Sequence, residues 1–300
     1  MKFIENKFIT IDGLKVRYID VGVGRPILLL HGGAIGSSLE IYKYIIPGLL
    51  KAGYRCVAFD QPGFGLSEIP KEESKIKRSY RKQVVNEFVE KLNLRNVVLL
   101  GHSQSGGAVG ELLLNRVRYC TAAVFLCSGI CLPPSERFKP RKGGLRDKYQ
   151  TFLEELTAED VRNFFEYNLY DRSLITEELI QDRLKYCVGE LYDFFVKYRA
   201  MPSDADYYLW AKFIEVDVPM MFVYGASDTI RDDATVRLKK MRALYPYSRF
   251  TFHLFNNCKH YPHWDQPKLT VESIVEFLEK HKEKEKQWLD SVTQTQMMSQ

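Results

Sequence analysis

The chain has 300 residues, of which 45% are hydrophobic and 27% charged, and its formal net charge is +5 at neutral pH. This composition is typical of a folded globular protein with ample core material. The apolar runs are too short to span a membrane, and the mild basic excess comes without a nucleic-acid-reading motif. We therefore expect neither a membrane span nor nucleic-acid binding.

Extended segments come first in the chain and then alternate with helices. Residues 8–11 and 14–20 predict a hairpin around Asp12-Gly13, which is a strong two-residue turn signal. Continuous apolar segments predict buried strands at 26–30, 54–59, 96–100 and 121–126, with helices at 39–52, 76–92 and 108–114. Later in the chain, strands are expected at 218–224 and 249–255 and helices at 232–243 and 267–282. The pattern predicts an α/β fold with a mostly parallel sheet and helices on both faces.

One long segment, residues 132–216, breaks this alternation because it contains no good buried strand. It opens with two prolines and then predicts helices that are rich in aromatic residues. We expect a helical cap over the carboxyl edge of the sheet, and a helical subdomain packed on itself is the alternative. The chain would then divide into a core at 1–131, the cap at 132–216, a second part of the core at 217–283 and a mobile tail at 284–300.

A short apolar strand, a serine and the start of a helix meet at residues 97–107. A strand that turns sharply into a helix presents a serine hydroxyl above the sheet, in the geometry of a nucleophile elbow. Small residues are needed on both sides of the serine because the two backbones nearly touch. Gly101 meets this need, and Ser105 stands where glycine is usual. Ser103 is therefore the candidate nucleophile, and an ordinary Gly/Ser turn is the alternative.

Further loops at strand carboxyl ends carry candidate chemistry, because ligands of parallel sheets bind at that edge. The glycine loop at the end of the third strand can aim the N–H of Gly33 at a developing oxyanion, together with the N–H of Gln104. Asp228 follows a buried strand and can orient a histidine. Asp232 and Asp233 are competing acids, which better suit the start of the next helix.

The loop after the last strand supplies the candidate base. His260 comes earliest in that loop, and His263 is the weaker candidate. A separate loop at 60–67 carries Asp60, which we expect to hold loops together rather than to take part in catalysis.

The candidate residues occur in the order Ser103, Asp228 and His260, which is the triad order of the α/β-hydrolases. The chain resembles a capped α/β-hydrolase in five stretches: HGG at 31–33, DQPGFGLS at 60–67, GHSQSGG at 101–107, YGASD at 224–228 and KHYPHWDQP at 259–267. The resemblance implies an eight-stranded sheet, attack by Ser103 on an acyl carbon and hydrolysis of the acyl-enzyme by water. The serine argues against the dehalogenase and epoxide hydrolase subfamilies, which would require aspartate there.

The cap sequence around Arg183 resembles that of the bacterial meta-cleavage-product hydrolases, which cut a carbon–carbon bond in 2-hydroxy-6-oxo-dienoates. By that resemblance Arg183 would bind a substrate carboxylate, and a surface arginine paired with Glu178 or Glu190 is the alternative. We expect His102 and Tyr261 to lie beside the substrate. That subfamily typically carries Asn at the position of His102 and Trp at the position of Tyr261. We therefore expect an esterase-like serine hydrolase first, with carbon–carbon cleavage or a slow small-molecule receptor as alternatives.

The six cysteines are scattered without the spacing of a disulfide framework, and most lie in apolar surroundings. They predict reduced, buried thiols, and without a secretory signal at the N-terminus they predict a cytoplasmic protein. A metal cluster of Cys258, His260 and His263 lacks a fourth ligand, so we expect neither a metal nor a cofactor. The expected partner is a small-molecule substrate, and the oligomeric state is left open.

Overall fold

The computed structural model describes residues 5–134, 156–204, 206–228, 234–283, 286 and 290. Within these residues, eight strands form one sheet in the order β1-β2-β4-β3-β5-β6-β7-β8. The strands are β1 (Lys7–Ile11), β2 (Leu14–Val21), β3 (Pro26–Leu30), β4 (Arg55–Phe59), β5 (Val97–His102), β6 (Cys120–Leu126), β7 (Met220–Gly225) and β8 (Phe250–Phe255). The strands expected from the sequence are all confirmed, with bounds that differ by at most two residues.

The sheet is antiparallel at one side and parallel elsewhere. β1 and β2 form the hairpin that Asp12-Gly13 predicts, and β2 pairs antiparallel with β4. The remaining neighbours run parallel, from β4 across to β8. Every residue of β3, β5, β6 and β7 is buried, because both faces of the sheet are covered. The parallel strands bring their carboxyl ends, and the loops that follow them, to one edge.

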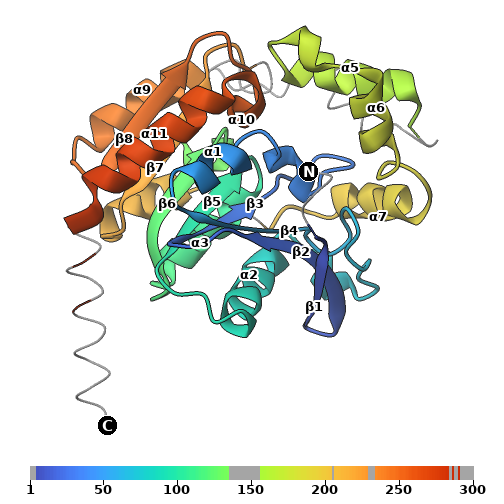
Figure 1. The fold of residues 1–300 in the computed structure, drawn as a ribbon, viewed down its shortest axis with the longest axis horizontal. Helices are drawn as coiled ribbons and strands as arrows, with labels where there is room; N and C mark the ends of the chain where they lie inside the picture. The colour runs from blue at the N-terminus through green and yellow to red at the C-terminus, as the bar shows by residue number, and fades with distance from the viewer. Residues whose placement is uncertain are drawn as a thin grey trace.

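Helices lie on both faces of this sheet, and Figure 1 shows α1 and α2 on opposite sides of it. The helices are α1 (Ile46–Lys51), α2 (Tyr80–Lys91), α3 (Ser105–Leu114), α5 (Ala158–Asn168), α6 (Glu177–Leu184), α7 (Gly189–Ala200), α8 (Leu209–Lys212), α9 (Ala234–Leu244), α10 (Pro262–Asp265) and α11 (Pro267–Lys280). Leu29 of β3 packs in the core with α1 and α11, whereas Leu28 packs in the core with α2, α3 and α9. Successive residues of a strand thus enter different cores.

The prediction of one continuous helix over residues 39–52 is wrong. A 3-10 turn, η1 (Leu39–Tyr42), is separated from α1, and Pro47 lies in the first turn of α1. A proline lacks the N–H that would bond to the preceding turn, and its ring clashes there, so a helix begins near it instead of running through it. The helix expected from residue 76 likewise begins only at Tyr80.

The regular elements of the inserted segment, within the residues that the structure describes, are helices. Between residues 156 and 216, with residue 205 left out, it holds α5 to α8 and no strand. In Figure 1, α5, α6 and α7 lie apart from α9 and α11. The boundaries of the cap stay a prediction, because residues 135–155 lie outside the described part of the chain.

The predicted tail at 284–300 also lies outside the described residues, apart from positions 286 and 290. Among the helices that the structure describes, none is both long enough and apolar enough to cross a bilayer.

Candidate active site

The elbow at Ser103 joins β5 to α3. Ser103 has a φ of +53°, a left-handed conformation that is unfavourable for a residue with a side chain. A Cβ added to Gly101 would lie 2.8 Å from the backbone nitrogen of Gly106, and one added to Gly106 would lie 2.0 Å from Ser128 Oγ. The closest backbone approach therefore needs glycine at 101 and 106, and a side chain is accommodated at Ser105.

The hydroxyl of Ser105 has partners of its own inside the protein. It donates a hydrogen bond to the His31 carbonyl and accepts one from Arg81 Nη1 at 3.0 Å. All three residues are buried. Ser105, which stands where glycine is usual, therefore links α2 and α3 to the start of the glycine loop by hydrogen bonds.

Ser103, His260 and Asp228 lie in one hydrogen-bonded line. The Ser103 hydroxyl donates to His260 Nε2 at 3.0 Å, and His260 Nδ1 donates to Asp228 Oδ2 at 2.9 Å. The whole of His260 is 5% exposed and the whole of Asp228 is 3% exposed. Asp228 follows β7 and His260 follows β8, so neighbouring parallel strands deliver both groups to the edge where the elbow lies. The competing acids at 232 and 233 lie outside the described residues.

Cys127, which directly follows β6, is a neighbour of this line that sequence reasoning missed. Burial and then the Asp228 carboxylate hold the pKa of the Cys127 thiol well above its usual range, and the thiol donates to the Lys259 carbonyl at 3.6 Å. Its position after a parallel strand was the available signal. The ligand atoms of Cys127, Asp228 and His260 lie within 4.8 Å of one another. Two of these groups, His260 and Asp228, are already joined by a hydrogen bond, which accounts for their closeness without a metal.

Buried histidines surround His260. His102 Nε2 donates to the His260 carbonyl at 2.9 Å, and the His102 ring lies 4.8 Å from the rings of Tyr261 and His263. Burial lowers the pKa of His102 well below its usual value and that of His263 to about 3, so both rings are neutral. Neither ring nitrogen of His263 has a hydrogen-bond partner. The structure thus brings His260 to Ser103, whereas His102 holds the backbone of His260.

The glycine loop after β3 lies against the elbow. A Cβ added to Gly32 would lie 3.1 Å from Ser103 Cβ, and one added to Gly33 would overlap the side chain of Gln104. The two residues predicted to supply oxyanion donors are therefore neighbours in space. Gln104 Oε1 accepts a hydrogen bond from the Tyr198 hydroxyl of α7. A helix of the inserted segment thus contacts the residue that follows the candidate nucleophile.

Arg183 of α6 is 7% exposed, so the alternative of a surface arginine is wrong. Its Nη2 donates to Ser37 Oγ at 3.4 Å, and its charge acts on the Tyr261 hydroxyl, whose pKa burial nevertheless raises above its usual value. Its guanidinium carbon lies 5.0 Å from the centroid of the Phe164 ring. Its Nε is buried and has no hydrogen-bond partner. A cation from the inserted segment therefore reaches the end of the glycine loop, beside the residue that follows His260.

Asp60 holds loops together, as expected. Its Oδ1 accepts from the N–H of Leu39 at 2.7 Å, and its Oδ2 accepts from the N–H of Leu66 at 2.8 Å. Arg17 Nε lies 2.6 Å from Asp60 Oδ2, and Arg17 Nη2 lies 2.7 Å from a carboxylate oxygen of Glu40. This buried charged group joins β2, η1 and the loop after β4.

Comparison with known proteins agrees with this geometry. Residues 25–166 match the family model described as alpha/beta hydrolase fold. The chain is 27% identical over 279 residues to a 2-hydroxy-6-oxononadienedioate/2-hydroxy-6-oxononatrienedioate hydrolase of Paraburkholderia phymatum, which covers 88% of this chain and 91% of that protein. A relative of the same name from Cupriavidus pinatubonensis is 25% identical over 289 residues, or 91% of this chain and 95% of that protein.

Solved structures share the fold. A meta-cleavage product hydrolase, CumD, from Pseudomonas fluorescens IP01 has a TM-score of 0.76 at 22% identity, over 92% of this chain and 98% of that chain. A bromoperoxidase from Bacillus anthracis has a TM-score of 0.74 at 22% identity, over 92% of this chain and 100% of that chain. At these identities the likeness establishes the fold alone.

The sheet order, the elbow and the loops at the carboxyl edge define an α/β-hydrolase fold. The family model matches the first half of this fold, and the curated relatives align along most of the chain. The chain has the α/β-hydrolase fold, and it is a hydrolase whose curated relatives are named as 2-hydroxy-6-oxononadienedioate/2-hydroxy-6-oxononatrienedioate hydrolases.

Proposed function

We propose that the protein is a serine hydrolase in which Ser103 is the nucleophile, His260 the general base and Asp228 the group that orients the base. The observation that carries this proposal is the hydrogen-bonded line from the Ser103 hydroxyl through the imidazole to the carboxylate, at 3.0 and 2.9 Å. The burial of His260 and Asp228 strengthens these bonds, because water does not compete for them.

The reaction proceeds in two halves. In the first, Ser103 Oγ bonds to an acyl carbon while its proton passes to His260 Nε2, and the carbonyl oxygen becomes an oxyanion. The oxyanion collapses, the bond to the leaving group breaks, and the leaving group takes the proton from His260. In the second half, water gives a proton to His260 and attacks the acyl carbon, and Ser103 leaves with that proton.

The N–H groups of Gly33 and Gln104 are the proposed donors to the oxyanion. Their support is the contact between the glycine loop and the elbow, where a Cβ on Gly32 would lie only 3.1 Å from Ser103 Cβ. Such donors act on charge that develops in the transition state, and losing one lowers kcat by roughly 10²- to 10³-fold.

The proposed substrate is a 2-hydroxy-6-oxo-dienoate whose carboxylate binds Arg183. The bond that is cleaved in this substrate is a carbon–carbon bond. Arg183 supports this class because it is buried beside the glycine loop and keeps an unpartnered Nε. The curated relatives that align along most of the chain are named as hydrolases of dioates of this type. These observations rank carbon–carbon cleavage above the ester cleavage expected first from the sequence.

Ester hydrolysis is the second candidate, and His102 is the residue that favours it. His102 stands where the carbon–carbon hydrolases typically carry Asn, and its ring is neutral and bonded to the His260 carbonyl. We propose that His102 holds the backbone of the base, and the substrate contact expected from the sequence stays a prediction. Tyr261 lies beside His260, with 5.7 Å between the ring centroids, and the charge of Arg183 acts on its hydroxyl.

One panel of substrates, assayed on one preparation, tests the proposal. The panel contains p-nitrophenyl acetate, a lactone and a 2-hydroxy-6-oxo-dienoate, and a fluorophosphonate probe reports the nucleophile. We expect the probe to label Ser103, the Ser103→Ala variant to lose labelling and turnover, and the dienoate to be the best substrate. Labelling at Ser105 or nowhere would contradict the nucleophile, and turnover of esters alone would favour the second candidate. An absence of turnover, with thermal stabilisation by an apolar ligand, would favour a receptor.

The cytoplasm is the proposed location, and a small molecule is the proposed partner. The location is supported by the six free and buried cysteines, which suit a reducing compartment. Measuring the free thiol content of protein purified without reductant tests it, since disulfides in fresh preparations would contradict it.

A further inference from the structure

Arg81 is a buried cation that the reaction scheme above does not use. It lies in the first turn of α2 and is 5% exposed. Burial lowers the pKa of Arg81, and the neighbouring groups that act on it are Tyr198 and Arg78, neither of which is a carboxylate. Its Nη2 is buried and has no hydrogen-bond partner among the residues that the structure describes. A buried guanidinium is normally paired with an acid, so its isolation here needs a reason.

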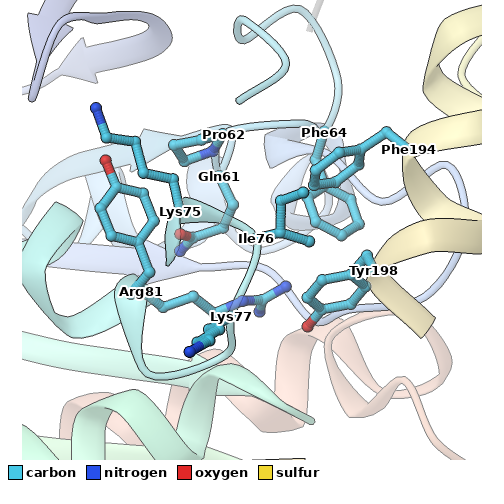
Figure 2. Close-up of a pocket in the computed structure, with 10 residues that line it drawn as sticks. Gln61, Pro62, Phe64, Lys75, Ile76, Lys77, Arg81, Phe194 and Tyr198 are labelled. Carbon is cyan, nitrogen blue, oxygen red and sulfur yellow. The ribbon is translucent and has the colours of Figure 1, made fainter. Parts of the chain in front are cut away.

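Aromatic rings, and not an acid, surround this cation. The guanidinium carbon lies 5.4 Å from the ring centroid of Phe64 and 5.6 Å from that of Tyr198. Figure 2 shows the Arg81 side chain running past Lys77 toward the Tyr198 ring of α7. Ring faces attract a cation without neutralising it, so the positive charge of Arg81 is preserved inside the protein.

The same guanidinium is connected to the glycine loop. Arg81 Nη1 donates to Ser105 Oγ, and the Ser105 hydroxyl donates to the carbonyl of His31. The imidazole of His31 is fixed as well, because its Nδ1 donates to the Gly32 carbonyl at 2.7 Å and its Nε2 accepts from the N–H of Gln61 at 2.9 Å. Arg81 therefore acts through Ser105 on the residue that begins the loop.

The unpartnered nitrogen lies at the candidate oxyanion hole. A Cβ added to Gly33 would lie 3.2 Å from Arg81 Nη2. His31, the nearest titratable group in the loop, is neutral because burial and then the Arg81 charge lower its pKa to about 3. The charge next to the Gly33 peptide is therefore that of Arg81.

The pocket on the outer side of Arg81 does not supply an alternative role. It is lined by Gln61, Lys75, Phe194 and Tyr198 among others (Figure 2), and its volume is only about 10 Å³. This is about the space of one water, so an organic anion does not fit beside Arg81 there.

We propose that Arg81 is a positioning residue for oxyanion stabilisation: through Ser105 and His31 it holds the Gly32–Gly33 loop against the elbow, and its unneutralised charge favours the oxyanion. Fixed positive charge aimed at a developing oxyanion acts strongly in a buried, water-poor site. The inference rests on the proposed serine mechanism, and it assigns a function to the serine that replaces glycine at position 105.

The test compares Arg81→Met, Arg81→Lys and Ser105→Gly with the wild type. Two quantities are measured on p-nitrophenyl butyrate: the kcat and KM values, and the affinity of a trifluoromethyl ketone that forms an oxyanion on Ser103. For Arg81→Met we expect kcat and ketone affinity to fall together by roughly 10- to 100-fold, with KM nearly unchanged. Arg81→Lys should recover part of the loss because it keeps a charge. Ser105→Gly, which keeps the charge and removes the link, should lie between the wild type and Arg81→Met.

Arg237→Met is the matched control, because Arg237 is also buried but bonds the carbonyls of Gly129, Leu132 and Pro133. It should lower the thermal midpoint and leave the kcat of the folded protein and the ketone affinity unchanged. A purely structural role for Arg81 would give that same result, and this outcome overturns the inference. If Arg81→Met does not fold, Ser105→Gly decides, since unchanged ketone affinity there overturns it as well.

The proposed serine mechanism and the inference about Arg81 are contradicted by different results. If the wild type shows no turnover or ketone binding that depends on Ser103, the serine mechanism is wrong and the inference about Arg81 falls with it. If the wild type behaves as a serine hydrolase and the Arg81 and Ser105 variants match it, the inference about Arg81 alone is wrong.

Discussion

The core of the molecule and the inserted helical segment contribute different groups to the site. Ser103, His260 and Asp228 follow strands of the core, and the bonds among them lie within the core. The segment at 156–216 contributes Arg183 and Tyr198, which reach the glycine loop and Gln104 from helices outside the sheet. In the proposed mechanism, the core would therefore make and break bonds, whereas the segment would select what is bound.

The largest effect is expected in the core. His260→Ala removes the proposed base, and kcat should fall by roughly 10⁴- to 10⁶-fold because the nucleophile loses its proton acceptor. Steady-state kinetics together with circular dichroism separate this loss from unfolding. The control is His263→Phe, which removes the other histidine of the loop and should keep most of the activity. Activity that survives in His260→Ala and disappears in the control would transfer the role of base to His263.

The next effect concerns stability at the junction of the two regions. Arg17 pairs with Asp60 and Glu40, and its Nη1 lies 3.5 Å from the hydroxyl of Tyr186, which belongs to the segment. Arg17→Met leaves the buried Asp60 carboxylate and the partly exposed Glu40 carboxylate without their cation, and should reduce the free energy of unfolding by about 3–5 kcal/mol. Tyr186→Phe removes only one neutral partner and should cost about 1 kcal/mol. Urea unfolding measures both, and similar losses would mean that this buried pair is not what joins core and segment.

A smaller effect, on selectivity, is expected in the segment. Arg183→Met should lower kcat/KM for a substrate with a carboxylate by roughly 10- to 100-fold, because a charge-assisted hydrogen bond is lost. Neutral esters should change little. Arg162→Met, at an exposed arginine of α5 that pairs with Glu177, is the control for the segment. Equal losses for anionic and neutral substrates would show that Arg183 does not bind the substrate carboxylate. The segment would then not select the substrate through this residue.

The smallest effect is a pH dependence that belongs to the core. Burial lowers the pKa of His31 and His263 to about 3 from an ordinary value of 6.5. Between these values the unfolded chain binds more protons, so stability is complete above pH 6.5 and falls as the pH drops toward 3. Between pH 7.5 and 5.5 each histidine should cost about 1.4 kcal/mol of unfolding free energy. His263→Phe should flatten this dependence in urea titrations, and an unchanged slope would show that His263 carries a proton in the folded state.

The core was predictable because its central strands, β3, β5, β6 and β7, are buried on both faces. That burial leaves continuous apolar runs, such as residues 26–30, which mark each strand to within two residues. Parallel strands also place every following loop at one edge, so the order of Ser103, Asp228 and His260 along the chain was enough to predict their meeting. Pro47 indicates that the helix predicted at 39–52 is divided, whereas the apolar pattern of these residues favours one continuous helix.

The contacts that the sequence did not predict are made by side chains from distant segments. Arg81 and Ser105 are 24 residues apart, and His102 and His260 are 158 apart. No periodicity or spacing encodes such pairs, because they depend on how helices pack on the sheet. The same holds for the burial of Arg183, since an arginine on a polar helix is as easily read as a surface residue.

The six cysteines have a practical consequence for work with this protein. All are free and buried, and burial raises the pKa of the thiols, to about 12 for Cys56 and Cys120 and to about 11 for Cys187. Only the thiolate reacts readily with alkylating dyes and oxidants. The native fold therefore presents almost no reactive sulfur, and one cysteine introduced on an exposed face, for instance in α5, would carry a fluorophore at a single site.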